Sequence, residues 1–210
     1  MPRPGRLASG RTGASRAGSD GPVQWLPTLM KGRPKKASDL VRQPRSSRPS
    51  ELLLVIVDAS ASTKRHQALS QAKGVLSQLF DDAYRSRTRL ALLTASGHAP
   101  SWQHQGLKAS SALSPWLSAL GAGGGTPLPQ ALEEARLWLT KRSKRYPSEQ
   151  QRVLVLTDGR LKQLPALLAF ECASLLIDME KGPIRLGRAR ELARGLGAEY
   201  RHIDELGSVE

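Results

Sequence analysis

Oxygen-bearing side chains gather in three short segments of the sequence. The segments are 58–62 (DASAS), 121–128 (GAGGGTPL) and 157–159 (TDG). They offer two aspartate carboxylates and four hydroxyls, of which those of Ser60, Ser62 and Thr126 are the candidate ligands, and they contain no histidine or cysteine. Hard oxygen donors of this kind select Mg²⁺ or a similar hard divalent ion.

The spacing within these segments also suits a small metal site. Ser60 and Ser62 alternate after an apolar run, so both hydroxyls are able to point the same way. The glycines at 123–125 let the backbone approach closely enough for Thr126 to reach in. Only two formal negative charges would then surround a doubly charged ion. A coordination position left open favours an incoming carboxylate.

The segments that position these residues alternate between strand and helix. The apolar run 52–58 is typical of a strand buried on both faces, as in a parallel sheet. Similar runs predict strands at 89–96, 153–158 and 173–178, and we expect two further strands in the more polar segments 98–105 (a short edge strand) and 199–203. Apolar residues at helical spacing predict helices at 63–83, 110–120 (interrupted by Pro115), 128–139 and 186–196.

This alternation predicts an α/β fold with a doubly wound, mainly parallel six-stranded sheet and helices on both faces. Such sheets commonly take the strand order 3-2-1-4-5-6, which makes strands 1 and 4 neighbours where the winding reverses. Asp58 and Asp158 end those two strands. They would flank the crevice in which doubly wound sheets bind ligands.

Charge and composition divide the chain near residue 50. Residues 1–50 carry 11 basic and two acidic side chains, which is +9 of the total net charge of +14. We expect 1–49 to be a largely disordered basic arm, 50–206 to be the folded domain and 207–210 to be a tail. A dense apolar island near 23–31 suggests either a docking segment or a helix packed on the chain's own domain.

Other features of the sequence exclude several classes of protein. No run of about 18 apolar residues predicts a membrane span. The single cysteine, Cys172, excludes a disulfide framework and a cysteine-based zinc site. The N-terminus lacks the apolar stretch of a secretion signal. We therefore expect a cytoplasmic protein.

The three motifs DASAS, GGGTPL and LTDG together resemble the metal-ion-dependent adhesion site of a von Willebrand factor A (VWA) domain. The usual pattern is DxSxS, then a distant threonine, then a distant aspartate. The resemblance implies Mg²⁺ as the cofactor, with five ligands, some of them acting through water: Asp58, Ser60, Ser62, Thr126 and Asp158. Ala61 stands where many VWA domains have glycine, which should not remove a ligand.

The sequence around the three motifs resembles one particular group of proteins with VWA domains. LLLVIVDASAST, FDDAYRSR, RVLVLTDGR and the stretch from LLIDMEKG to HIDEL look like the VWA part of the magnesium chelatase D subunit, over roughly residues 20–206. Full-length D subunits add an AAA+-like domain and an acidic, proline-rich linker, which this chain lacks. The resemblance therefore implies the short, free-standing type that works with a separate ATPase subunit. Cobalt insertion for cobalamin is then as plausible as magnesium insertion for chlorophyll.

The resemblance implies a non-catalytic interaction subunit that grips a carboxylate of a partner through the ion. The expected partners are an AAA+ ATPase chelatase subunit and the large tetrapyrrole-binding subunit. A nucleic-acid-associated module is the alternative, because the basic arm is able to neutralise phosphates, although it has few aromatics to stack on bases. An enzyme that uses the metal directly lacks a positioned general base in the three loops.

Each motif also has a plainer interpretation. Asp58 and Ser60 are suitable caps for the helix that follows, and Thr126 before Pro127 is a suitable helix N-cap. Asp158 with Gly159 is typical of an ordinary turn. Arg160 either steers an acidic partner or is a simple surface residue. The four histidines are expected at the surface or on edges, and the basic run 141–146 at a solvated helix end.

Overall fold

The computed structural model describes residues 23–42, 50–59, 68–108, 125, 127–161, 168–181 and 186–206. The chain divides after Ser50 into two compact units, Met1–Ser50 and Glu51–Glu210. Three of the predicted ligands, the expected 110–120 helix and the tail at 207–210 lie outside the described residues; the three ligands are Ser60, Ser62 and Thr126.

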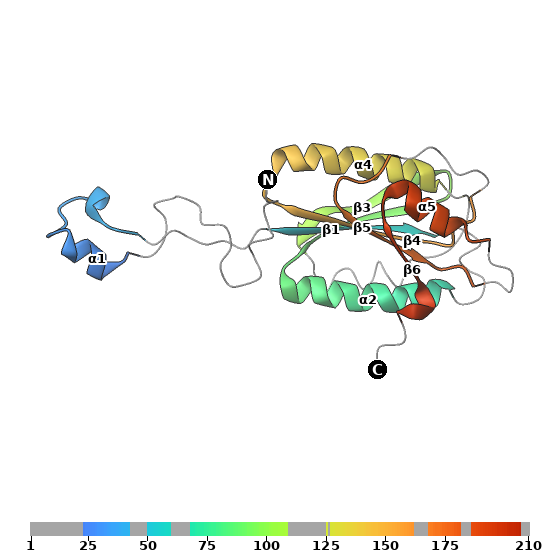
Figure 1. The fold of residues 1–210 in the computed structure, drawn as a ribbon, viewed down its shortest axis with the longest axis horizontal. Helices are drawn as coiled ribbons and strands as arrows, with labels where there is room; N and C mark the ends of the chain where they lie inside the picture. The colour runs from blue at the N-terminus through green and yellow to red at the C-terminus, as the bar shows by residue number, and fades with distance from the viewer. Residues whose placement is uncertain are drawn as a thin grey trace. The chain divides into compact units, whose positions relative to one another are not determined.

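The larger unit is built on a six-stranded sheet (Figure 1). Its strand order is β3-β2-β1-β4-β5-β6, and every neighbouring pair is parallel except β2 with β3. This confirms the predicted doubly wound α/β fold and its strand order. The strands are β1 (Glu51–Asp58), β2 (Arg89–Ser96), β3 (Ala99–Lys108), β4 (Gln150–Thr157), β5 (Ala173–Asp178) and β6 (Glu199–His202).

The edge strand β3 is antiparallel because its connection to β2 is too short for a crossover. Only Gly97 and His98 separate the two strands, and a parallel pair needs a connection of about a dozen residues or more. Gly97 has a φ of +71°, a backbone conformation that a side chain would strain. The predicted edge strand is therefore correct, and it extends further along the chain than the expected end at residue 105.

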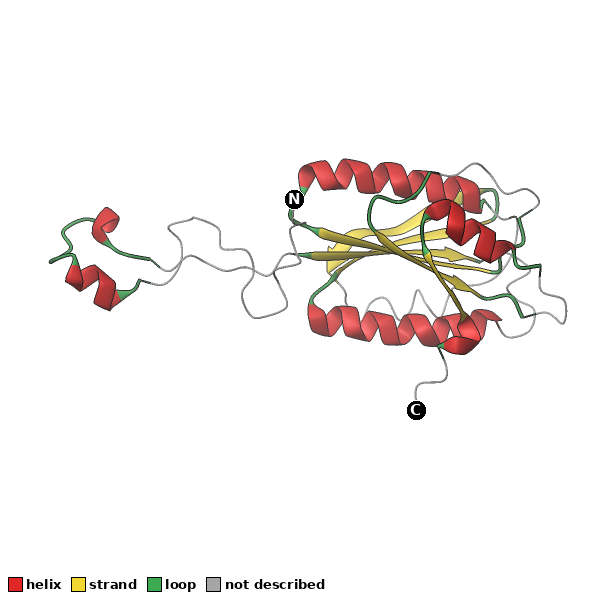
Figure 2. Cartoon of the chain, in the orientation of Figure 1, coloured by secondary structure: helices red, strands yellow, loops and turns green. Residues whose placement is uncertain are grey.

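Helices cover both faces of the sheet (Figure 2). One face carries α2 (Ala68–Ser86), and the opposite face carries α4 (Leu128–Arg145) and α5 (Arg188–Leu196). A short 3₁₀ helix, η3 (Ile203–Glu205), follows β6. Within the described residues no helix is long and apolar enough to cross a membrane.

Strand β1 shows how the sequence creates two cores. Leu54 and Ile56 pack into the cluster beneath α4 and α5, whereas Val55 and Val57 pack into the cluster with α2. All four side chains have 0% exposure. Because successive side chains of a strand point to opposite faces, an unbroken apolar run is what a doubly covered central strand requires.

The smaller unit contains two short helical turns, α1 (Trp25–Met30) and the 3₁₀ helix η1 (Ala37–Asp39). An isolated antiparallel bridge joins Val23 to Arg42. The expected docking segment near 23–31 lies on α1.

The packing corrects the expectation that the basic run 141–146 is solvated. Helix α4 continues through the basic run to Arg145, but Arg142 is not solvated: its side chain is 12% exposed and pairs with buried Glu149 at 2.6 Å. Trp138 and Tyr146 contact its guanidinium. His202 does lie on an edge strand, as expected, yet it is only 5% exposed because η3 folds back over it.

Candidate metal centre

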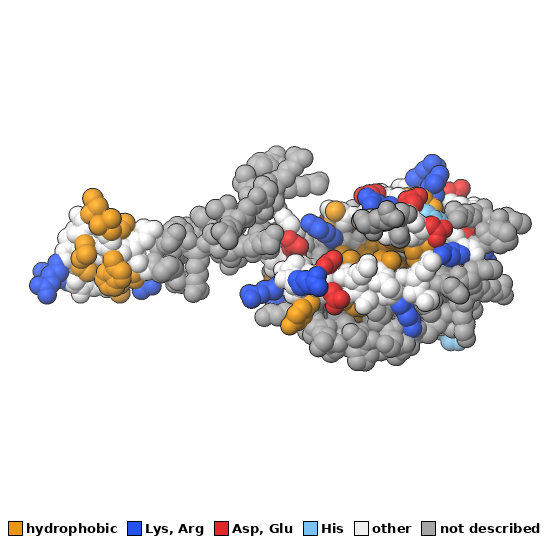
Figure 3. Space-filling model, turned by 90° about the horizontal axis from the view of Figure 1, so that it is seen from below, with side chains coloured by type: hydrophobic (Ala, Val, Ile, Leu, Met, Phe, Trp, Pro, Cys, Tyr) orange, Lys and Arg blue, Asp and Glu red, His pale blue; other side chains and the backbone are white. Residues whose placement is uncertain are grey.

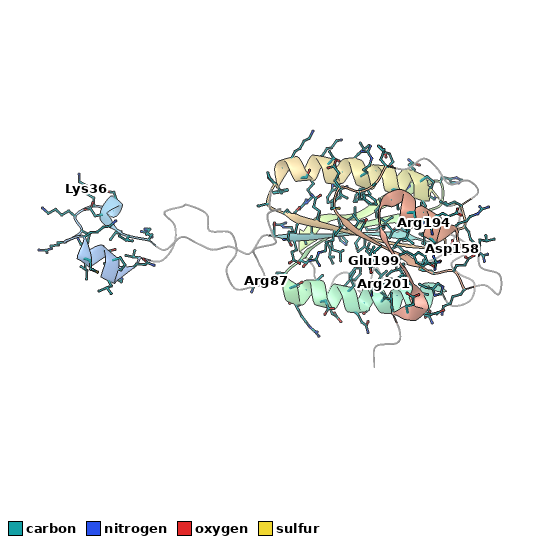
Figure 4. All side chains as sticks on the ribbon, in the orientation of Figure 1. Lys36, Arg87, Asp158, Arg194, Glu199 and Arg201 are labelled. Carbon is teal, nitrogen blue, oxygen red and sulfur yellow. The ribbon has the colours of Figure 1, made fainter. Side chains whose placement is uncertain are left out.

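The two predicted carboxylate ligands lie at the same edge of the sheet. Asp58 is the last residue of β1, and Asp158 directly follows β4, the strand that pairs with β1. Asp58 is 0% exposed and Asp158 is 4% exposed. Figure 4 shows Asp158 at the end of the larger unit opposite to Arg87, which precedes β2. This is the carboxyl edge of the parallel strands, where ligands of doubly wound folds bind.

A threonine that the sequence analysis did not assign joins the two loops. The Oγ1 of Thr157 donates a hydrogen bond of 2.8 Å to Oδ2 of Asp58. The same oxygen accepts a bond of 3.0 Å from the backbone N–H of Gly159. Thr157 is 0% exposed, so it holds one carboxylate oxygen and orients the loop carrying Asp158. The position of Thr157 directly before the aspartate in LTDG is the feature of the sequence from which this role could have been predicted.

Gly125, the residue before Thr126, lies beside the turn that follows β2. A Cβ placed on Gly125 would lie 2.8 Å from the carbonyl oxygen of Gly97, so only glycine tolerates this approach. The neighbour of Thr126 therefore lies at the carboxyl edge, although Thr126 is not described. The N-cap of α4 is Pro127, with no side-chain capping bond. The interpretation of Thr126 as the N-cap of this helix is wrong by one residue.

The loop after β4 is held by two local contacts. Asp158 Oδ1 accepts the backbone N–H of Arg160 at 3.1 Å, as in the turn expected from the sequence. Gly159 has a φ of +66°, and a Cβ there would lie 2.5 Å from the backbone nitrogen of Ala189. The amino end of α5 therefore packs directly against this loop.

A buried carboxylate beyond the loop engages Arg160. The Nε of Arg160 lies 3.5 Å from Oε1 of Glu180, whose side chain is 1% exposed. The other Glu180 oxygen accepts backbone N–H groups of Leu186 and Gly187, which lead into α5. Arg160 remains 35% exposed. It is therefore an exposed arginine, as one of the two expectations had it, that also pairs with a buried carboxylate.

Burial also changes the protonation of a neighbouring pair. Asp178, at the end of β5, accepts hydrogen bonds from Glu180 N at 2.8 Å and from the Tyr200 hydroxyl at 2.8 Å. Loss of hydration raises the pKa of Asp178 despite these two bonds. Burial, reinforced by the bond to Asp178, raises the pKa of Tyr200 to about 12.

The donor chemistry at the carboxyl edge suits a hard divalent ion. Burying two carboxylates on neighbouring strands is costly, and a bound cation offsets that cost. The nearby His202 is not available as a ligand, because Nε2 lies 3.0 Å from the carbonyl of Glu180 and Nδ1 accepts Asp204 N. In the part of the chain that the structure describes, no three His, Cys, Asp or Glu side chains cluster to hold an ion.

The cysteine and the other histidines of the chain differ in their surroundings. Cys172 packs partly buried against the core, as expected, and burial raises its pKa to about 11. His98 is exposed and His104 is half-buried on the edge strand β3, while His66 lies outside the described residues.

Two curated proteins are similar to the chain. An uncharacterized protein of Mycobacterium tuberculosis is 30% identical over 179 residues, which cover 80% of this chain and 28% of that protein. The magnesium-chelatase 60 kDa subunit of Rhodobacter capsulatus is 32% identical over 125 residues, covering 60% and 22% respectively. The chain thus matches less than a third of the length of either relative.

Solved structures support the same fold. The manganese-loaded TRAP protein of Plasmodium vivax superposes with a TM-score of 0.56 at 18% identity, covering 75% of this chain and 70% of that chain. The model of the von Willebrand factor type A domain matches residues 53–160, which include both aspartates. The chain therefore belongs to the von Willebrand factor type A domain family.

Proposed function

We propose that the domain binds Mg²⁺, or another hard divalent ion, at the carboxyl edge of its sheet and uses that ion to hold a carboxylate of a partner protein. Asp58, Ser60, Ser62, Thr126 and Asp158 would supply the protein ligands, some through water. The observation that carries the proposal is the pair of buried carboxylates, Asp58 and Asp158, at the ends of two neighbouring strands.

The coordination and the charges at the carboxyl edge favour an acidic ligand. Two carboxylates cannot complete the coordination of a hard divalent ion, which takes six or more oxygen ligands. Hydroxyls and water supply neutral oxygens, so a partner carboxylate would take a coordination position that water otherwise fills. Arg160 at the rim adds a cation whose partner, Glu180, is buried behind it.

The biological setting follows from the relatives. Similarity to a magnesium-chelatase subunit supports a role in a chelatase-type complex of the cytoplasm. In this role the chain has no catalytic activity alone. The AAA+ ATPase subunit and the large tetrapyrrole-binding subunit would hydrolyse ATP and insert magnesium or cobalt. The acidic residue that reaches the ion would belong to one of them.

The test is partner binding with and without the ion. The full chain is titrated with each purified chelatase subunit of its host, in Mg²⁺ and in EDTA. We expect the contact made through the ion to be present in Mg²⁺ and lost in EDTA, so that the affinity is higher in Mg²⁺. Thr126→Ala should weaken it even where the ion still binds, because Thr126 is expected to adjust the coordination when the carboxylate arrives.

Salt separates this mechanism from attraction by the basic arm. Screened charge holds partners, including nucleic acid, less tightly as salt rises, and it is insensitive to chelators. Binding that survives EDTA and Thr126→Ala but disappears at moderate salt would replace the metal bridge with the arm. Retention on nucleic acid with the same salt dependence would favour the alternative module.

A further inference from the structure

The helix α1 presents four large apolar side chains to solvent. Trp25 is 62% exposed, and the other three are between 58% and 81% exposed: Leu26, Leu29 and Met30. Their spacing at i, i+1, i+4 and i+5 places them on one side of the helix. Figure 3 shows apolar side chains at the surface of the smaller unit. Grouped exposure of this kind marks an interaction surface, whereas a single exposed leucine does not.

The chain around α1 is closed by a buried threonine. Thr28 is 1% exposed; its Oγ1 donates to Gln24 O at 2.7 Å and accepts from Val41 N at 2.9 Å. Gln24 N also donates to Val41 O at 2.7 Å. These bonds tie the start of α1 to a segment 13 residues later. We call residues 23–42 the docking loop.

A second tie uses the loop's one acidic residue. Asp39 Oδ2 accepts the backbone N–H groups of Lys35 and Lys36 at 2.9 Å and 3.0 Å. These bonds lower the pKa of Asp39, because they stabilise its ionised carboxylate. The carboxylate therefore interacts with the backbone of the docking loop itself. The docking loop thus holds its shape by polar contacts.

The apolar side chains have no part in that internal scaffold. Within the described helix α1, Thr28 alone is buried. Burying large apolar side chains is the main stabilising term in protein association, and here four of them stay in water. A shape fixed by hydrogen bonds, with its apolar residues outward, is preorganised for binding and loses little entropy when a partner arrives.

The charge around the patch defines the partner's chemistry. Exposed cations follow α1 directly, at Lys31, Arg33, Lys35 and Lys36. Figure 3 shows basic side chains beside the apolar patch of this unit. An apolar groove with acidic side chains at its rim complements this arrangement, because the rim charges steer encounter and the groove supplies burial.

We propose that the docking loop inserts the exposed face of α1 into an acidic-rimmed apolar groove on the chelatase-type ATPase subunit. The identity of that partner rests on the proposed function, but the contact itself is independent of the metal centre. It gives the chain a second attachment point that does not need the ion. Two linked contacts raise the overall affinity above that of either one.

A lipid surface is the competing occupant. Helices that lie in a bilayer interface are usually longer amphipathic segments with an extended apolar face. Helix α1 has six residues, and the loop is already closed by Thr28 and Asp39. A short, rigid, convex element is better matched to a shaped groove than to a fluid surface.

The test uses the full chain and the purified ATPase subunit of the same host. Leu26→Ser with Leu29→Ser removes apolar contact while leaving Thr28 and Asp39 in place. The dissociation constant should rise about tenfold or more, in both Mg²⁺ and EDTA. Leu137→Ser, an exposed leucine of α4 (46%), is the control and should change it less than about twofold.

Two further variants separate shape from charge. Thr28→Val keeps all four apolar side chains but removes the hydroxyl that closes the loop, so binding should weaken if preorganisation matters. Lys35→Glu with Lys36→Glu should weaken binding most at low salt, because it opposes the acidic rim. Asp58→Ala should remove only the part of the binding that depends on Mg²⁺.

Several outcomes would overturn the proposal. Unchanged affinity in the double leucine variant would show that α1 is not at the contact, even where Mg²⁺-dependent binding persists. Absence of any binding in EDTA would show that α1 makes no contact that is independent of the ion. Leucine-dependent binding to vesicles of phosphatidylglycerol and phosphatidylcholine, without binding to the ATPase subunit, would assign the loop to membranes. Leucine-dependent self-association alone would assign it to a second copy of the chain.

Discussion

At the scale of single residues, Thr157 is the support on which the metal centre depends. Thr157→Val keeps the shape of the side chain but removes the partner of Asp58 Oδ2 and of Gly159 N. We expect the free energy of unfolding without metal to fall by about 1–3 kcal/mol, and Mg²⁺ affinity to fall with it. Chemical denaturation and calorimetry measure the two effects.

Thr94→Val is the matched control for that substitution. Thr94 is also a buried strand threonine, 5% exposed, but its Oγ1 has no hydrogen-bond partner among the described residues. Valine there should leave stability unchanged or raise it by about 1 kcal/mol, because no bond is lost. Equal losses in the two variants would mean that the hydroxyl of Thr157 has no special role.

Asp178 should make stability depend on pH in an unusual direction. Its pKa in the folded protein is raised above the ordinary value of 3.8, chiefly by burial. The unfolded chain therefore binds fewer protons, and this residue lowers stability at neutral pH, an effect that disappears as pH falls through the raised pKa. Asp178→Asn should be relatively more stable at pH 7, by about 1 kcal/mol, with an advantage that shrinks toward pH 4.

Denaturation at several pH values checks this expectation. In the Asp178→Asn variant the side-chain amide oxygen would still accept the N–H of Glu180, and the amide NH2 would donate to the Tyr200 hydroxyl oxygen in place of the bond that Oδ2 accepts. Asp81→Asn, at an exposed position of α2, is the control and should show no such trend. A stability difference that grows as the pH falls would contradict the assignment.

The residues that sequence analysis missed share one physical feature. Thr157 and Glu180 act through hydrogen bonds and ion pairs between segments far apart in the chain. Composition and periodicity report which face of an element a residue occupies, and not which distant group it meets. Arg142 was misjudged for the same reason, because its partner Glu149 lies beyond the end of the helix.

At the scale of elements, Gly159 joins the loop after β4 to α5. Gly159→Ala would place a methyl group 2.5 Å from backbone atoms of Ala189 and strain a φ of +66°. We expect a loss of about 2 kcal/mol or more and weaker Mg²⁺ binding, because the loop carrying Asp158 must shift. Thermal denaturation and calorimetry measure both.

Gly195→Ala tests whether that loss is specific. Gly195 lies within α5 with open space around its Cα, and alanine there should stabilise the helix by about 0.5–1 kcal/mol. Opposite signs in the two variants support the contact between the loop and the helix. A loss in both would point to general sensitivity of α5.

The order of the elements was predictable, whereas their ends were less so. Apolar runs ending in polar residues identified the four central strands, β3 and β6 were expected from more polar segments, and the alternation with helices gave the strand order. Strand β4 begins at Gln150, three residues before its apolar run, because pairing with β1 extends through polar residues that periodicity does not register. Likewise α4 continues past its apolar face to Arg145, where Arg142 packs on Tyr146.

At the scale of the whole molecule, the basic arm and the domain should contribute separately. Deleting residues 1–19 should leave the thermal transition nearly unchanged, because that stretch has few apolar side chains to bury. Deleting through Lys36 also removes Trp25, Leu26, Leu29 and Met30, and it should weaken partner binding. If the two truncations behave alike in both measurements, the apolar island has no role of its own.

The central claim is that Asp58 and Asp158 hold a hard divalent ion, and calorimetric titration of the full chain with Mg²⁺ tests it most directly. The wild type should bind one ion. Asp58→Ala should abolish binding while circular dichroism shows a folded domain, and Asp81→Ala, which removes an exposed carboxylate of α2, should bind as the wild type does. Unchanged Mg²⁺ binding by folded Asp58→Ala would contradict the account.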